Sequence, residues 1–130
     1  MKIIPEQVIQ QEIVQYFNYA YCLKHHMPSM IIFSVPNGIP IPIPAKERAR
    51  ALDLLHKTGM KNGISDLIIQ GMYGRIVNVE VKTETGTQSQ AQIEIEEKIR
   101  VLEGVYILVR SLLEFQQKIS LHIDWLLGKI

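Results

Sequence analysis

The sequence has one cysteine, no long hydrophobic run and almost no net charge. Cys22 cannot build an internal disulfide framework, and we interpret it as a small buried apolar residue, with a reactive thiol as the alternative. No apolar stretch approaches the ~20 residues that span a bilayer, so we expect no membrane-spanning segment. Pro5 and Glu6 interrupt the N-terminal apolar residues before they reach the length of a signal peptide, which predicts a cytoplasmic protein.

The net charge of +1 excludes a protein that binds nucleic acid through its overall charge. Any such contact must come from a local patch. Between residues 46 and 61 there are five cations and only two acids, Glu47 and Asp53. The cations are Lys46, Arg48, Arg50, Lys57 and Lys61. A solvated helix face is the alternative interpretation of this segment.

The composition, 47% hydrophobic and 21% charged over 130 residues, is typical of one globular domain spanning residues 1–130. In its first half, helical spacing of apolar residues predicts a helix over about 6–25. "MIIFSV" (30–35) predicts a short buried strand that ends at the turn-forming Pro36-Asn37-Gly38. Alternating prolines in 39–44 predict an extended arm, and a second helix follows over about 45–58.

In the second half, "SDLIIQGMYGRIVNVEVK" (65–82) predicts two short strands joined by a turn. We expect a helix over about 89–103, a buried strand in "VYILVR" (105–110) and an amphipathic helix over 112–127. The order α-β-α-β-β-α-β-α predicts an α/β fold with a mixed central sheet flanked by helices.

Polar residues follow one face of the second strand of the hairpin. Side chains alternate across a strand, so Glu80 and Lys82 share one face, roughly 6–7 Å apart, opposite the valines. If the turn is centred near Tyr73, Asp66 lies opposite Glu80. Two carboxylates then converge with an ammonium group beside them.

Two like charges at close range need a cation or a proton between them. Mg²⁺ takes carboxylate and carbonyl oxygens and keeps several waters, so this pair could hold it, while Lys82 could bind a phosphate oxygen or tune an attacking water. The alternative is a solvated hairpin face on which Asp66, Glu80 and Lys82 form ordinary cross-strand pairs.

Two predicted helices carry polar residues at the ends of their apolar stripes. Glu6 and Gln10 extend the stripe of the first helix, and Gln92 extends that of the third. Each has a simpler explanation. Glu6 can stabilise a helix N-terminus, and Ser89 with Gln92 matches a capping box. We expect these polar groups to form the walls of a pocket around the acid pair.

The arrangement resembles the VRR-NUC family of the PD-(D/E)xK nuclease superfamily over almost the whole chain. The matching segments, in the family's order, are "EQVIQ" (6–10), "VPNG" (35–38), "KTGMKNGISDLII" (57–69), "VEVK" (79–82) and "SQAQ" (89–92). The sequence has Ile64-Ser65 where a proline often precedes the family aspartate. The resemblance implies a restriction-endonuclease-like fold.

The resemblance also implies a DNA phosphodiesterase that depends on Mg²⁺ or Mn²⁺. Lys82 would then position or activate a water, with Gln92 beside it in a supporting role. The implied metal ligands are Asp66, Glu80 and the carbonyl of Val81. The implied catalytic set is Asp66, Glu80, Lys82, Gln92, Glu6 and Gln10.

Small members of this family resemble Holliday-junction resolvases, which implies branched DNA as substrate and a homodimer. A restriction-type duplex endonuclease and a non-catalytic DNA-binding module are the alternatives. The basic segment 46–61 becomes the expected track for the DNA backbone, together with Asn37. The arm 39–44 and the last helix, through Leu121 and Trp125, are candidates for the dimer surface, unless they only complete the core of one chain.

Overall fold

The computed structural model describes residues 2–23, 28–36 and 44–130. It confirms the predicted α/β fold with a mixed sheet flanked by helices. In chain order the elements are α1 (Glu6–Tyr21), β1 (Ile31–Ser34), α2 (Ala45–Lys57), β2 (Leu67–Gln70), η1 (Met72–Gly74), β3 (Ile76–Val81), α3 (Gln90–Val101), β4 (Val105–Val109), α4 (Leu112–Ile119) and α5 (Ile123–Leu126). No helix within these ranges is long and apolar enough to cross a bilayer.

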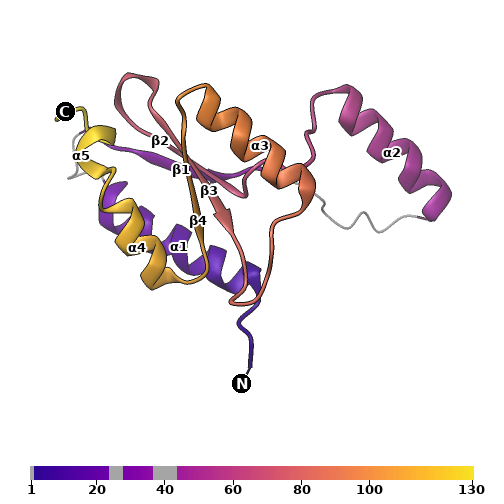
Figure 1. The fold of residues 1–130 in the computed structure, drawn as a ribbon, viewed down its shortest axis with the longest axis horizontal. Helices are drawn as coiled ribbons and strands as arrows, with labels where there is room; N and C mark the ends of the chain where they lie inside the picture. The colour runs from indigo at the N-terminus through magenta and orange to yellow at the C-terminus, as the bar shows by residue number, and fades with distance from the viewer. Residues whose placement is uncertain (1, 24–27, 37–43) are drawn as a thin grey trace.

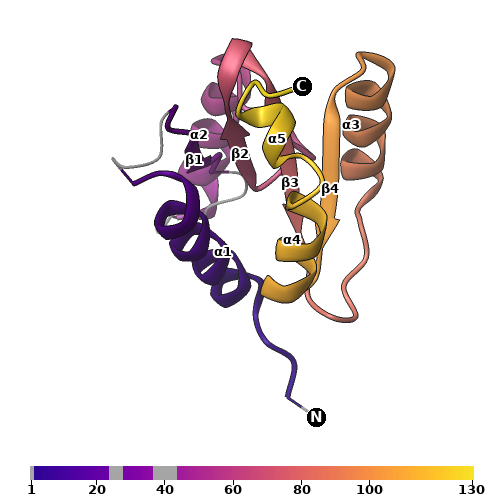
Figure 2. The same ribbon diagram turned by 90° about the vertical axis from the view of Figure 1, so that its left-hand side faces the viewer.

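The sheet has four strands in the order β1-β2-β3-β4. Strand β2 runs antiparallel to both β1 and β3, whereas β4 runs parallel to β3. Figure 2 shows α1, α4 and α5 on one side of the sheet and α3 on the other. In Figure 1, α2 projects beyond the sheet and beyond these helices.

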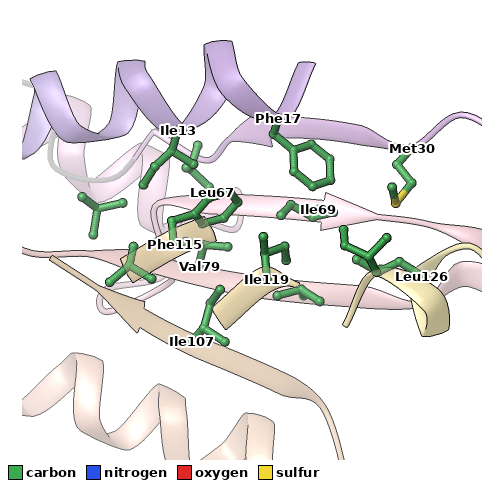
Figure 3. Packing of buried hydrophobic residues seen from close by; sticks show 14 of the residues in the cluster. Ile13, Phe17, Met30, Leu67, Ile69, Val79, Ile107, Phe115, Ile119 and Leu126 are labelled. Atoms are coloured by element: carbon green, nitrogen blue, oxygen red, sulfur yellow. The ribbon is translucent and has the colours of Figure 1, made fainter. Parts of the chain in front are cut away.

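The main hydrophobic core lies between the sheet and the layer of α1, α4 and α5 (Figure 3). The three valines of β3, namely Val77, Val79 and Val81, all point into it, as the strand alternation predicted. Phe17 of α1 meets Phe115 of α4 edge-on, with ring centroids 6.2 Å apart. Each fully buried side chain of this size stabilises the fold by about 1.5–3 kcal/mol.

The hairpin has the predicted register. Leu67 pairs with Val79 and Ile68 with Asn78, so continuing the ladder by one residue places Asp66 opposite Glu80. The turn is centred on Tyr73, whose φ of 60° lies in the left-handed region.

Two predicted helices differ from the observed ones. The first ends at Tyr21 rather than near residue 25, and residues 24–27 lie outside the described part. The predicted helix 112–127 is divided into α4 and α5. The Ser120 hydroxyl donates to the carbonyl of Gln117 (2.7 Å), and the turn tightens as the amide of His122 donates to the carbonyl of Ile119 (2.9 Å). A hydroxyl that bonds back to the helix in this way favours its end.

The prediction that 30–35 is a buried strand is wrong for its outer face. β1 is an edge strand, and Ile31 and Phe33 are 55% and 43% exposed because no helix of the described chain covers this side. Of the candidates for a dimer surface, residues 39–43 lie outside the described ranges, Leu121 is exposed, and Trp125 is half-buried beneath the Arg75 guanidinium.

Candidate active site

The polar face of β3 is buried against the α3 side of the sheet. Glu80 and Lys82 are only 1% and 8% exposed, although both carry ionisable groups. Within residues 2–23, 28–36 and 44–130, the ammonium of Lys82 has no hydrogen-bond or ion-pair partner at all. Burial of a charged group without a partner is costly, so such a group needs a functional explanation.

Asp66 precedes β2 and is held beside Glu80 by backbone contacts. The amide N–H of Val81 donates to Oδ2 of Asp66 (2.8 Å). The carbonyl of Asp66 in turn accepts from the amide of Val35 (3.0 Å), which fixes the backbone next to β1. The two carboxyl groups are close enough for Asp66 and Glu80 to share a hydrogen bond.

Gln92 reaches the same carboxyl group from the first turn of α3. Its side-chain Nε2 donates to Oε1 of Glu80 (2.8 Å). Its Oε1 accepts from the amide of Ser89 (2.8 Å), and its own amide donates to the Ser89 hydroxyl (3.2 Å), which completes the capping box. The capping box is therefore confirmed, and the side-chain amide of Gln92 that takes part in it also contacts Glu80.

Ser89 and Gln92 allow the two contacts of this turn to be separated. The Ser89→Ala variant is expected to lose about 1 kcal/mol of unfolding free energy, because it removes the N-cap of α3. It should leave the side-chain amide of Gln92 in contact with Glu80. The Gln92→Leu variant is expected to lose a similar amount of stability and also at least about tenfold in Mn²⁺ affinity or DNA cleavage, because Glu80 loses its donor. Urea unfolding measures the stability of both variants, and Mn²⁺ titration and a DNA cleavage assay measure their metal affinity and activity. Equal Mn²⁺ affinity and cleavage in the two variants would reduce Gln92 to a capping residue.

Tyr106 and Gln88 also surround Glu80, and the sequence reasoning missed both. The Tyr106 hydroxyl lies 3.4 Å from Oε2 of Glu80 and accepts from Nε2 of Gln88 (3.2 Å). Nε2 of Gln88 also donates to Glu96 on α3 (3.0 Å). A signal was available, because Tyr106 is the one residue with a polar tip in the apolar strand "VYILV" and shares a face with Glu80 once β4 pairs in parallel with β3.

The charges of Asp66 and Glu80 favour the binding of a cation between them. Burial has the largest effect on the pKa of Glu80, followed by the charge of Asp66 and the hydrogen bond with it, and together they raise this pKa to about 8. The positive charge of Lys82 lowers it, but by less than the other effects raise it. Within the described residues no third His, Cys, Asp or Glu side chain converges on the pair. Two carboxylates and a nearby carbonyl match the incomplete protein ligand sets in which Mg²⁺ keeps several waters.

This site belongs to a fold that is already known. A solved structure described as a "VRR_NUC domain protein" superposes on the chain with a TM-score of 0.70 and 19% sequence identity, covering 95% of this chain and 92% of that one. The chain has the VRR-NUC fold. No protein-family model and no curated protein matches the sequence.

In this VRR-NUC fold the two remaining candidates, Glu6 and Gln10 of helix α1, are less buried than the apolar stripe that they were expected to extend. The buried stripe runs through Ile9, Ile13 and Phe17, whereas Glu6 is exposed and Gln10 is half-buried. The charge of Glu6 still reaches Glu80, because it contributes to the raised pKa of that carboxyl. Gln10 has no hydrogen bond to any described residue of the site.

Gly63 fixes how the chain approaches Asp66. Its φ is +81°, and a Cβ at this position would lie 2.3 Å from the backbone oxygen of Ala91 in the first turn of α3. Only glycine permits this close crossing. The loop that leads to Asp66 is therefore held against the turn that carries Gln92.

The cations predicted to follow the DNA backbone lie on α2 and on the loop after it. All five, Lys46, Arg48, Arg50, Lys57 and Lys61, are exposed. Lys57 forms an exposed pair with Asp53 (2.8 Å), which contributes little stability. Lys61 also lines a groove of ≈ 510 Å³ between the end of α2 and the first turns of α3. Asn37 lies outside the described residues.

Proposed function

We propose that this protein is a divalent-metal-dependent nuclease that hydrolyses phosphodiester bonds in DNA. One observation carries the proposal: two carboxyl groups, Asp66 and Glu80, meet beside the buried Lys82, whose ammonium has no hydrogen-bond or ion-pair partner among the described residues. The likeness to a structure described as a VRR_NUC domain protein supports the same conclusion. Ordinary cross-strand pairing does not account for a buried lysine whose ammonium has no hydrogen-bond or ion-pair partner within the described part of the chain.

Asp66, Glu80 and the carbonyl of Val81 would hold Mg²⁺ or Mn²⁺ in this proposal. When bound, such an ion polarises a phosphate oxygen and lowers the pKa of a water. The residues of the chain do the rest. Gln92 and the amide of Val81 orient the two carboxylates, and Lys82 either binds a phosphate oxygen or holds the attacking water. Glu6 and Gln10 would complete the site from α1.

The cations of α2 and the loop after it are proposed to follow the DNA backbone, with Asn37 on the preceding turn. Their exposure supports this role, because Lys and Arg bind phosphate while remaining solvated. The loop continues directly to Asp66. A strand of DNA that follows these cations would therefore approach the acid pair.

We propose that the substrate is branched DNA of the Holliday-junction type and that two chains act together. Two symmetric cuts require two sites related by a two-fold axis, which a homodimer supplies. Sequence-specific readout of duplex DNA would need an added element that enters a groove, and a chain of 130 residues leaves little room for one.

A comparison of three DNA substrates tests this function. With Mg²⁺ or Mn²⁺ present, we expect a four-way junction to be cleaved at least about tenfold faster than a flap or a linear duplex, and EDTA to abolish cleavage, because the metal lowers the barrier by several kcal/mol. Equal cleavage of the linear duplex would instead indicate a restriction-type enzyme. Tight DNA binding without any cleavage under these conditions would overturn the nuclease proposal in favour of a binding module.

A further inference from the structure

The loop of residues 83–88 joins two segments that supply polar groups to the candidate active site. Lys82 precedes this loop, and the capping box of Ser89 and Gln92 follows it. The amide of Lys82 is fixed to the end of β4, because it donates to the carbonyl of Val109 (3.0 Å). The side chain of Lys82 extends from there toward the loop, so the conformation of the loop affects where its ammonium lies.

The loop is held by the side chain of Arg110, the residue that follows β4. Its Nη1 donates to the carbonyls of Gly86 (2.6 Å) and Thr83 (2.8 Å). The carbonyl of Glu84 accepts a longer bond from the same nitrogen (3.4 Å). Hydrogen bonds from an ionised donor are shorter and roughly twice as strong as those between neutral groups. One guanidinium therefore binds three carbonyls of a single short loop.

Arg110 connects this loop to a rigid part of the fold. Its own amide donates to Oε1 of Glu114 in the first turn of α4 (2.9 Å), and the amide of Glu114 donates to the Ser111 hydroxyl (3.1 Å). Among the residues that the structure describes, no carboxylate forms an ion pair with Arg110. The charge of this half-buried arginine is therefore directed at the carbonyls of the loop.

The part of the loop that Arg110 binds also covers the aliphatic part of Lys82. A Cβ placed on Gly86 would lie 3.7 Å from Cδ of Lys82, so the backbone of the loop packs against this side chain. The amide of Gly86 donates to the carbonyl of Thr83 (3.3 Å), which closes the turn. Lys82 is only 8% exposed although it lies beyond the end of β3. The loop therefore contributes to the burial of Lys82.

We propose that Arg110 is a positioning residue for Lys82. By holding the loop closed, its guanidinium keeps the aliphatic part of Lys82 covered and its ammonium beside Asp66 and Glu80. Groups that act in a reaction must be held closely in place, and a displacement of about 1 Å can slow the reaction about 10²-fold. The effect on cleavage rests on the proposed function, whereas the effect on the loop is independent of it.

Acetylation of lysines tests the effect on the loop in the full chain, without metal or DNA. In Arg110→Met the loop should open more often, and we expect Lys82 to be acetylated at least about fivefold faster than in the unaltered protein. Mass spectrometry of the digested protein measures the rate at each lysine. Lys98, which is exposed on α3, is the internal reference and should react at the same rate in every variant.

Arg75→Met is the matched control for this experiment. Nη1 of Arg75 also donates to two backbone carbonyls, at 2.6 and 2.5 Å, so the same substitution removes bonds of the same kind. Arg75 precedes β3 and Lys82 follows it, which places the two residues at opposite ends of the strand. Arg75→Met should therefore leave the acetylation of Lys82 within about twofold of its rate in the unaltered protein.

Cleavage assays test the effect on the reaction. Arg110→Met should lower kcat at least about tenfold, while KM for DNA and the Mn²⁺ affinity change by no more than about threefold, because the ligands and the DNA contacts remain. Arg110→Lys should retain part of the rate, since an ammonium can still donate to a carbonyl. Guanidinium ion at roughly 20 mM, far below denaturing concentrations, should restore part of the rate of Arg110→Ala and none of the rate of Lys82→Ala.

The outcomes separate this inference from the proposed function. Equal acetylation of Lys82 in Arg110→Met and in the unaltered protein would overturn the inference, as would an equal kcat. A parallel loss of kcat, Mn²⁺ affinity and melting temperature without rescue by guanidinium would also overturn it, because Arg110 would then support the fold in general. If Arg110→Met does not fold, Arg110→Lys supplies the same comparison. An unaltered protein that never cleaves DNA would refute the proposed function, and the acetylation of Lys82 would still decide whether Arg110 positions it.

Discussion

The Lys82→Ala variant is expected to cleave DNA about 10²–10⁴-fold more slowly than the unaltered protein, while its Mn²⁺ affinity stays within about threefold. The ammonium of Lys82 lies in the interior beside the acid pair and has no partner among the described residues. Its removal therefore costs no hydrogen bond of the fold. Its proposed task is to hold a phosphate oxygen or the attacking water, which is a contact made during the reaction. Single-turnover cleavage and Mn²⁺ titration measure the two properties separately.

Two companion variants sharpen this result. Asp66→Asn is expected to lose both Mn²⁺ binding and cleavage, because it removes a ligand charge from the pair. Lys98→Ala, which removes an exposed lysine of α3, should change neither property by more than about twofold. If the Lys82→Ala protein retained more than a tenth of the cleavage rate, Lys82 would have no catalytic role. If Asp66→Asn retained Mn²⁺ affinity, the proposed metal site would be wrong.

The Glu80→Gln variant is expected to be more stable than the unaltered protein at pH 8 and above, although it should be inactive. The pKa of Glu80 is raised from 4.5 to about 8 in the folded chain, first by burial and then by Asp66. Between these two pH values the unfolded chain has lost the proton and the folded chain keeps it. The folded state therefore loses stability as pH rises through this window, by up to about 5 kcal/mol in total.

Glutamine keeps the shape of Glu80 and its contact with Gln92 but carries no charge. Without metal, its melting temperature at pH 8.5 should exceed that of the unaltered protein by at least about 5 °C, and the difference should vanish near pH 4.5. Mg²⁺ should raise the melting temperature of the unaltered protein only, because the ion binds the charged carboxylate.

Thermal unfolding in EDTA between pH 4.5 and 9 provides the measurement. Glu97→Gln, which changes an exposed carboxyl group on α3, is the matched control and should leave the pH dependence unchanged. A Glu80→Gln protein that melted below the unaltered one at pH 8.5 would contradict a raised pKa at Glu80. The comparison of the two variants shows whether the acid pair lowers the stability of the folded chain, as a preorganised pair of carboxyl groups should.

Much of the candidate site could be predicted from the sequence because the geometry of a strand is regular. Side chains of a strand alternate with a period of two, so the order of residues in "IVNVEVK" was enough to separate the core valines from Glu80 and Lys82. The turn at Tyr73 then set the register that brings Asp66 opposite Glu80. The capping box of Ser89 and Gln92 was readable for the same reason, since it is local.

Contacts between segments that are distant in the sequence could not be predicted from such local patterns. Tyr106 contacts Glu80 only because β4 pairs in parallel with β3. The direction of β4 depends on the crossover connection through α3, and the sequence of neither strand specifies it. The second contact of Gln92, to Glu80, depends on the same packing, as does the crossing of Gly63 over Ala91. The sequence also did not show that the buried stripe of α1 begins at Ile9 and leaves Glu6 exposed, because a helix can turn about its axis until Ile9 faces the core.

The sequence by itself determined which residues alternate between core and polar face, where the turns fall and which acids share a strand face, since these depend on local geometry. The tertiary structure alone decided how deeply Glu80 and Lys82 are buried, which raises the pKa of Glu80 and leaves the ammonium of Lys82 without a hydrogen-bond or ion-pair partner among the described residues. It alone also decided that β1 and α2 keep apolar faces exposed. Burial is a property of all the elements that surround a residue, and no stretch of neighbouring residues contains that information.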